Sequence, residues 1–197
     1  MKRGVNKQSS ATGSIRIISG QYRGRKLPVL NAQGLRPTTD RLKETLFNWL
    51  MPYVSQSTCL DMFAGSGSLG FEALSRYAKW CTFIEMAPQA ANNIKQNLQT
   101  LKIDHSAAEV KQGDAFALCA SLPQQFDLIF IDPPFHQQLV PRALDVLIHN
   151  NVLAKGALIY VECERQASTY SAPDNWQLIK QKDTSNLSSR LFELNDS

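Results

Sequence analysis

The stretch Leu60–Gly70, with the sequence LDMFAGSGSLG, constrains the fold more than any other part of the chain. It follows the apolar end of a predicted strand and precedes residues 71–78, where apolar side chains recur at helical spacing. Gly65 and Gly67 allow a sharp turn and the close approach of a ligand to the backbone, and Gly70 allows the helix to pack against the strand. A strand, a glycine turn and a helix in this order predict the first βα unit of a nucleotide-binding type of fold.

The glycine spacing from Gly65 to Gly70 also matches the dinucleotide fingerprint, so the glycines alone leave two cofactors open. Asp61 falls at the carboxyl end of the strand, beside the place where a pyrophosphate would rest on the helix N-terminus. A carboxylate there repels a phosphate but suits the ammonium of a methionine moiety. Asp61 therefore favours S-adenosylmethionine over NAD, and an NAD-dependent oxidoreductase stays open as a second class of function.

The rest of the chain alternates between strand and helix patterns. This alternation predicts an α/β fold, a Rossmann-like and mostly parallel doubly wound sheet, with an antiparallel pair at one edge. We expect strands at 80–84, 109–112, 126–131 and 157–162, helices at 87–101 and 139–148, and the edge pair at 176–182 and 189–194.

Four carboxylates fall at the carboxyl ends of predicted strands, where a doubly wound sheet binds its ligands: Asp61, Glu85, Asp114 and Asp132. Glu85 lies about 20 residues after the glycine turn, where an acidic residue can accept from both ribose hydroxyls. Asp114 could accept from an adenine amino group, cap a helical turn at Ala115, or do both.

The motif Asp132-Pro133-Pro134-Phe135 directly follows the buried strand at 126–131. Two prolines fix an extended turn and remove two backbone donors, so the motif offers only acceptors beside an aromatic ring. Such acceptors can hold an exocyclic amine by its N–H groups and aim its lone pair at a methyl donor. Phe135 is placed to stack on the base, a contact that contributes about 1–3 kcal/mol in comparable sites.

The N-terminal part of the chain is strongly basic. Residues 1–44 carry ten basic side chains against two acidic ones, a net charge of +8, whereas the remaining 153 residues carry −4. We expect three segments, namely a disordered tail at 1–13, a basic hairpin and loop at 14–38, and a Rossmann-like domain at 39–197. The cations that we expect to contact phosphates are Arg16, Arg23, Arg25, Lys26, Arg36 and Arg41.

Together these motifs resemble a known family. The pattern Asp61-x-Phe63-x-Gly65-x-Gly67 with Asp132-Pro133-Pro134-Phe135 is similar to amino-methyltransferases that use S-adenosylmethionine. The blocks RIISG at 16–20, RGRKL at 23–27, LRPTTDR at 35–41 and FNWL at 47–50 resemble the RsmD family more narrowly. The chain departs from the family at Tyr77, where a glycine is usual.

The resemblance covers residues 14–195 and implies a class I methyltransferase that modifies N2 of a guanine in 16S ribosomal RNA, in the small ribosomal subunit. It implies that Asp132 and the Pro133 carbonyl orient the amine while Phe135 stacks the base. The implied cofactor-binding residues are Asp61, Phe63, Gly65, Gly67, Glu85, Met86, Asp114 and Ala115. The Asp-Pro-Pro-Phe motif is shared with enzymes that act on adenine N6 or cytosine N4, and a non-catalytic RNA-binding assembly factor is a further alternative.

Composition excludes several other classes of protein. Hydrophobic residues make up 43% and charged residues 19% of the chain, and no apolar run reaches membrane-spanning length. We therefore expect a cytoplasmic protein without a membrane partner. The four cysteines form no C-x-x-C pair, so we expect buried, reduced thiols, no metal site and a monomer.

Overall fold

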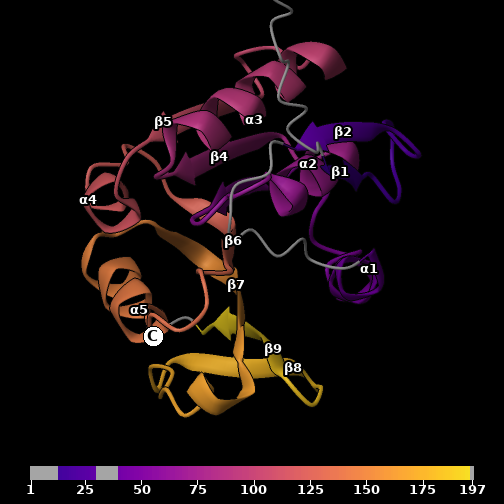
Figure 1. Ribbon diagram of the computed structural model, residues 1–197. Coiled ribbons are helices and arrows are strands. Elements are labelled where there is room, and N and C mark those ends of the chain that lie inside the picture. Colours follow the sequence, from indigo (N-terminus) through magenta and orange to yellow (C-terminus); the bar gives the residue numbers. More distant parts are fainter. Residues whose placement is uncertain (1–12, 30–39, 196–197) are drawn as a thin grey trace, which may run out of the picture.

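A seven-stranded sheet forms the centre of the molecule (Figure 1). The computed structural model describes residues 13–29 and 40–195. Along the sheet the strand order is β5-β4-β3-β6-β7-β9-β8. The strands are β3 (Thr58–Asp61), β4 (Trp80–Glu85), β5 (Ala108–Gln112), β6 (Phe126–Ile131), β7 (Leu153–Glu164), β8 (Trp176–Asp183) and β9 (Leu187–Leu194).

Strands β3 to β7 are parallel, whereas β9 pairs antiparallel with β7 and β8 pairs antiparallel with β9. This arrangement confirms the predicted Rossmann-like sheet with an antiparallel edge pair. The order reverses between β3 and β6, which creates the crevice where doubly wound folds bind ligands. The middle strand β6 reads FDLIFI and is buried except at Asp127, as expected of a parallel strand that is covered on both faces.

The helices cover the two faces of the sheet in separate groups (Figure 1). Helices α1 (Asp40–Trp49), α2 (Ser68–Ser75) and α3 (Pro88–Leu101) pack on one face. Helices α4 (Ala115–Cys119) and α5 (Val140–His149) pack on the other, and the single turn η1 (Arg165–Ala167) follows β7. Within residues 13–29 and 40–195, no helix is long and apolar enough to cross a membrane.

A short hairpin, β1 (Gly13–Arg16) with β2 (Lys26–Val29), forms a second sheet beside α2. The sequence predicts this hairpin, but its first strand ends earlier than the apolar run 15–18 suggests. The reason is a buried carboxylate on α2. Glu72 is fully buried and accepts from the Ile18 N–H at 2.8 Å and the Ser19 N–H at 3.0 Å, which turns these amides away from β2. Arg76 Nε donates to the same carboxylate at 2.8 Å.

The loop of the hairpin is held against the end of α2. The Gln21 N–H donates to the Ser75 carbonyl at 2.8 Å, and the Tyr22 N–H donates to Ser75 Oγ at 3.0 Å. Gly20 has φ +83°, and a Cβ at this position would lie 1.8 Å from the Ser75 carbonyl oxygen, so only glycine fits. Tyr77 has φ +70°, in the left-handed region that favours glycine, and the residue is 54% exposed.

Candidate active site

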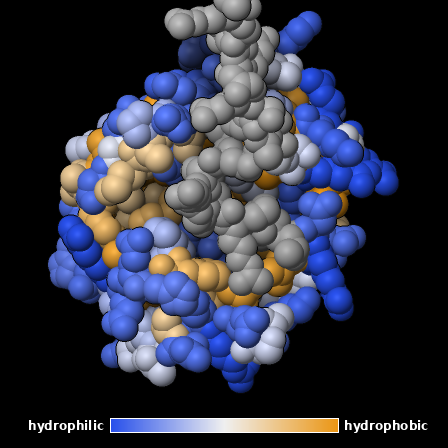
Figure 2. Space-filling view, viewed as in Figure 1, coloured by the Kyte–Doolittle hydropathy of each residue, from blue (hydrophilic) through white to orange (hydrophobic). Residues whose placement is uncertain are grey.

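A large cavity opens at the carboxyl ends of β3, β4 and β6, where the sequence places the acidic rim. Its volume is about 950 Å³, and α1, α2, α4, the hairpin and the segment after β6 also contribute to its lining. Figure 2 shows hydrophobic side chains gathered in a hollow on this face. A cavity of this size, apolar with a few polar groups, can hold a nucleoside-sized ligand.

The glycine turn between β3 and α2 adopts the predicted geometry. Gly65 has φ +54° and Gly67 has φ +78°, values in the left-handed region that favours glycine. A Cβ on Gly70 would lie 2.2 Å from Cε1 of Phe83 and 2.8 Å from Sγ of Cys81. The first two glycines therefore form the turn, and the third lets α2 lie against β4, which confirms their predicted structural roles.

Asp61 ends β3 and is only 2% exposed. Its carboxylate accepts from the Gly70 N–H at 3.0 Å. Burial raises the pKa of Asp61 to about 7, the Gly70 hydrogen bond opposes this shift, and the charge of Glu85 adds to it. A cationic group of a ligand would favour the ionised form, and the expected contact of Asp61 with the ammonium of a methionine moiety stays a prediction.

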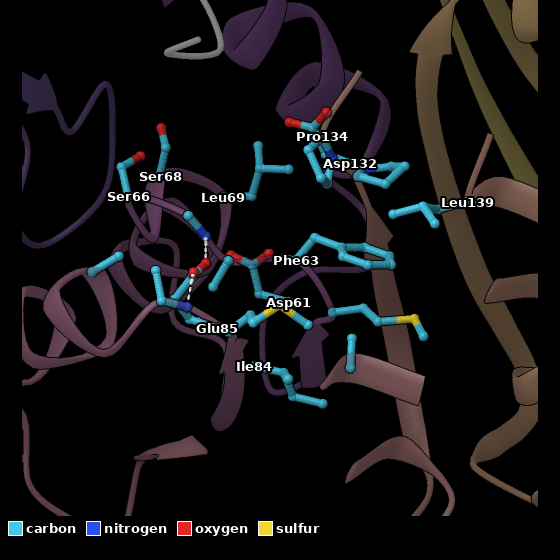
Figure 3. Close-up of a pocket in the computed structure, with 18 of the residues that line it drawn as sticks. Asp61, Phe63, Ser66, Ser68, Leu69, Ile84, Glu85, Asp132, Pro134 and Leu139 are labelled. Atoms are coloured by element: carbon cyan, nitrogen blue, oxygen red, sulfur yellow. Dashed lines mark hydrogen bonds between the residues drawn. The ribbon is translucent and has the colours of Figure 1, made fainter. Parts of the chain in front are cut away.

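Glu85 ends β4 and holds the glycine turn through its side chain. Its carboxylate accepts from the Gly65 N–H at 2.7 Å and from the Ala87 N–H at 2.7 Å (Figure 3). A carboxylate offers about four lone-pair directions, so both oxygens can still accept from hydroxyl groups of a ligand. Met86 lines the cavity beside it and is 63% exposed.

Asp114 lies at the start of the short helix α4, with Ala115 also lining the cavity. The Asp114 side chain accepts from the Ala117 N–H at 2.9 Å, so its capping role is confirmed, and its expected contact with an adenine amino group stays a prediction. The rings of Phe63 and Phe116, a residue of α4, meet edge to face with 5.8 Å between their centroids. Together they form an aromatic wall of the cavity.

Asp132 and the proline turn lie at the far side of the cavity from Glu85 (Figure 3). Pro133 is buried, and Phe135 lines the cavity beside Asp132. The segment that follows the proline turn is bonded to β7, since the His136 N–H donates to Oε1 of Glu164, the last residue of that strand. The structure therefore brings the cofactor-type carboxylates and the acceptor-only turn to one cavity, as the strand ends predict.

Most of the predicted RNA-binding cations lie on the hairpin. Arg16, Arg23, Arg25 and Lys26 are exposed, and Arg25 Nη2 also donates to the Thr100 carbonyl at 3.3 Å. The surface over β1 and β2 is mainly hydrophilic (Figure 2). The second residue of α1, Arg41, is exposed as well, whereas Arg36 lies outside the described residues. Contact of these side chains with phosphate stays a prediction.

Sequence reasoning missed a buried lysine beside the glycine turn. Lys43 is 2% exposed, and its ammonium donates to the Arg16 carbonyl at 2.5 Å and to Ser68 Oγ at 3.1 Å. Burial lowers the pKa of Lys43, while the carboxylates of Glu72 and Asp40 oppose the shift. The sequence does contain a pattern that indicates its burial. Leu46, Phe47 and Leu50 follow Lys43 by 3, 4 and 7 residues, which places all four on the same face of a helix.

Two other residues of the cavity were also missed. Glu162 lines it and is 3% exposed, and its place at the end of the predicted strand 157–162 is the signal that identified the other rim carboxylates. Arg142 lies on α5 with its guanidinium 3.9 Å from the centroid of the Phe116 ring. No sequence pattern joins Arg142 to Phe116, because the two residues belong to separate helices.

Comparisons with known proteins agree with this geometry. A family model described as Conserved hypothetical protein 95 matches residues 15–193. The Haemophilus influenzae protein named Ribosomal RNA small subunit methyltransferase D is 54% identical over 186 residues, covering 93% of this chain and 96% of the relative. The Escherichia coli protein of the same name is 46% identical over 184 residues, covering 93% and 92%.

Solved structures show the same fold. The structure of the Escherichia coli protein yhhF superposes with a TM-score of 0.87 at 43% identity, covering 94% of this chain and 100% of that one. A structure from Haemophilus influenzae gives a TM-score of 0.82 at 49% identity, covering 93% and 100%. With its Rossmann-like class I methyltransferase fold, the glycine turn and the Asp-Pro-Pro-Phe turn in one cavity, the chain belongs to the RsmD family of methyltransferases.

Proposed function

We propose that this chain transfers the methyl group of S-adenosylmethionine to N2 of a guanine in 16S ribosomal RNA of the small ribosomal subunit. The observation that carries the proposal is the cavity that joins an acidic glycine-turn site to an acceptor-only proline turn. The relatives from Haemophilus influenzae and Escherichia coli, both named as small-subunit ribosomal RNA methyltransferases, support the RNA substrate.

The residues around the glycine turn fit S-adenosylmethionine. Asp61 offers a buried carboxylate to the ammonium of the methionine moiety, and Glu85 offers acceptors to the ribose hydroxyls. The aromatic wall of Phe63 and Phe116, with Asp114 beside it, suits the adenine ring. When bound, the cofactor supplies an electrophilic methyl group on a positively charged sulfur.

The proline turn prepares the amine of the substrate. The lone pair of an exocyclic amine is delocalised into the base, so the nitrogen is a poor nucleophile unless it is oriented. Asp132 and the Pro133 carbonyl accept its two N–H bonds, and Phe135 stacks on the ring. Held in this way, the nitrogen would direct its lone pair at the methyl group of a bound cofactor, whose sulfur would take the electron pair of its bond to that methyl group, and the Asp132 carboxylate would take the proton that the nitrogen loses. Positioning of this kind can supply about 7–11 kcal/mol.

The basic hairpin and its loop, residues 14–38, form the RNA-binding unit in this proposal. Because Glu72 and Ser75 hold the described part of the hairpin on α2, the cations lie at a defined place relative to the glycine turn. Cations that contact phosphates position an RNA without reading its sequence. The base must be unpaired or flipped out of its stack to enter the cavity.

Substitution of Asp132 tests the mechanism. Asp132→Ala removes the acceptor and should lower the single-turnover rate of methyl transfer by about 10²–10³, as for other preorganised hydrogen bonds. Asp132→Asn should retain more activity, because its amide oxygen can still accept one bond. Affinity for RNA should fall much less than the rate in both variants. A near-normal rate for Asp132→Ala at saturating cofactor and RNA would overturn the mechanism and leave the motif as a structural turn.

Two further measurements test the cofactor and the substrate. S-adenosylhomocysteine should raise the melting temperature of the purified protein, and NAD should not. Stabilisation by NAD would point to an oxidoreductase, and no effect of either ligand would point to a non-catalytic RNA-binding protein. In cells that lack this protein, one guanine of 16S ribosomal RNA should lack its N2 methyl group. Loss of a methyl group from an adenine or a cytosine instead would show that the protein modifies another base.

A further inference from the structure

Glu162 lies next to Asp132 at the edge of the cavity. Strands β6 and β7 are parallel neighbours (Figure 1), and Ile131 pairs with Val161, so Asp132 and Glu162 are the residues that directly follow this pair. Neighbouring strands lie about 4.8 Å apart, and paired residues point to the same face of a sheet. Both side chains line the cavity, together with Pro133 and Phe135.

Glu162 accepts a hydrogen bond from a buried phenol. The Tyr160 hydroxyl donates to Glu162 Oε2 at 2.6 Å and lies 3.3 Å from Ser189 Oγ. Tyr160 is 1% exposed, and burial, followed by the charge of Glu162, raises the pKa of its phenol well above the usual value. A carboxylate can accept about four hydrogen bonds, so Glu162 has the capacity to bond to Tyr160 and to a further donor at the same time.

Asp132, the Pro133 carbonyl and Glu162 therefore form a row of oxygen acceptors among the described residues of the cavity. Three bases of RNA carry an exocyclic amine, and they differ in the ring nitrogens beside it. In guanine one of the two neighbouring ring nitrogens, N1, carries a hydrogen, whereas the neighbouring ring nitrogen of adenine, N1, and that of cytosine, N3, are bare acceptors. An acceptor row matches the two neighbouring donor groups of guanine and places a lone pair against a lone pair for the other two bases.

We propose that Glu162 accepts the N1 hydrogen of the target base and thereby makes the cavity selective for guanine over adenine and cytosine. This inference rests on the proposed function and specifies how its substrate is chosen. A buried acceptor that has no donor weakens binding, because it has lost its hydrogen bonds to water and gained none. Sites that form a hydrogen bond to an N–H group therefore strongly reject analogues that lack this group.

The test uses two RNA substrates that differ at the target position, one with guanosine and one with 2,6-diaminopurine riboside. Both bases carry the N2 amine, but diaminopurine has an acceptor at N1. The unaltered protein should methylate the diaminopurine RNA with a kcat/KM that is lower by about 10² or more. In Glu162→Gln the amide N–H can donate to a bare N1, so the ratio of diaminopurine to guanosine should rise at least about tenfold.

A matched control separates base recognition from a general effect of removing a carboxylate. Glu109→Gln on the distant strand β5 makes the same chemical change and should keep the preference for guanosine. Equal methylation of both RNAs by the unaltered protein would overturn this inference alone, even if Glu162→Gln failed to fold. An unchanged ratio in folded Glu162→Gln, or the same shift in Glu109→Gln, would also overturn it. Failure of the unaltered protein to methylate guanosine RNA would overturn the proposed function as well.

Discussion

Replacing Asp61 by Asn should stabilise the ligand-free protein although it alters the candidate site. The Asp61 carboxylate is 2% exposed and accepts a hydrogen bond from the Gly70 N–H at 3.0 Å. Above its raised pKa of about 7, the folded protein must hold a negative charge in a buried place. Asparagine has the same shape, carries no charge and can still accept from Gly70 through its amide oxygen.

The size of the effect follows from the pKa difference between the folded and unfolded states. The pKa of Asp61 rises from 3.8 to about 7 on folding, so between these values the folded state keeps a proton that the unfolded state has released. The free energy of unfolding therefore falls as the pH rises through this window, by about 4 kcal/mol in total. Asp61→Asn cannot lose stability in this way, because asparagine does not titrate. The free energy of unfolding of the variant minus that of the unaltered protein should therefore rise by about 2–3 kcal/mol between pH 5 and pH 8 and level off above pH 7.

Urea denaturation of both proteins at several pH values, followed by circular dichroism, measures this advantage. Asp174→Asn, which removes one exposed carboxylate, serves as the matched control for the loss of a charge and is measured in the same way. The same Asp61→Asn protein should bind S-adenosylmethionine more weakly by calorimetry, because the partner of the ammonium is gone. If the difference in stability between Asp61→Asn and the unaltered protein is the same at pH 5 and pH 8, burial does not raise the pKa of Asp61 and the reasoning is refuted.

Three other variants test separate parts of the molecule. Glu85→Ala should weaken cofactor binding by about 1–3 kcal/mol, and an unchanged affinity by calorimetry would remove Glu85 from the binding site. Joint replacement of Arg23, Arg25 and Lys26 by Ala should weaken RNA binding and leave cofactor binding intact. The slope of log affinity against log salt concentration should become shallower by about 0.7–0.9 for each phosphate that the protein no longer neutralises, and an unaltered slope would mean that the hairpin does not contact phosphates. Glu72→Ala leaves two backbone N–H groups and a guanidinium without their acceptor. Urea denaturation should therefore show that the free energy of unfolding falls by about 3–5 kcal/mol, and a fall of less than about 1 kcal/mol would contradict the anchoring role of Glu72.

The sheet and the acidic rim could be predicted because both follow from local patterns. Buried strands read as apolar runs, and a carboxylate after such a run must lie at the ligand-binding edge when the strands are parallel. Asp61, Glu85, Asp114 and Asp132 follow this rule, and all four line the cavity. Glu162 obeys the same rule at the last parallel strand, so the sequence held the signal for this residue as well.

Other features depend on contacts that no local pattern encodes. Glu72 stands in the apolar stretch of α2, and its partners are the backbone amides of Ile18 and Ser19, 54 and 53 residues away. Backbone amides belong to nearly every residue type, so a sequence gives no sign of which ones a distant carboxylate will bind. The contact of Arg142 with Phe116 likewise arises only when α4 and α5 pack together.

The place of β9 in the sheet has a consequence for the synthesis of the chain. Strand β9 follows all other described strands in the sequence, yet it lies between β7 and β8 and pairs with both. A chain growing from its N-terminus therefore completes the parallel part of the sheet while the edge of β7 still presents unpaired N–H and C=O groups. Interrupted translation within residues 187–194 would release a protein with a finished glycine turn and an open edge strand, ready to pair with a second unfinished chain.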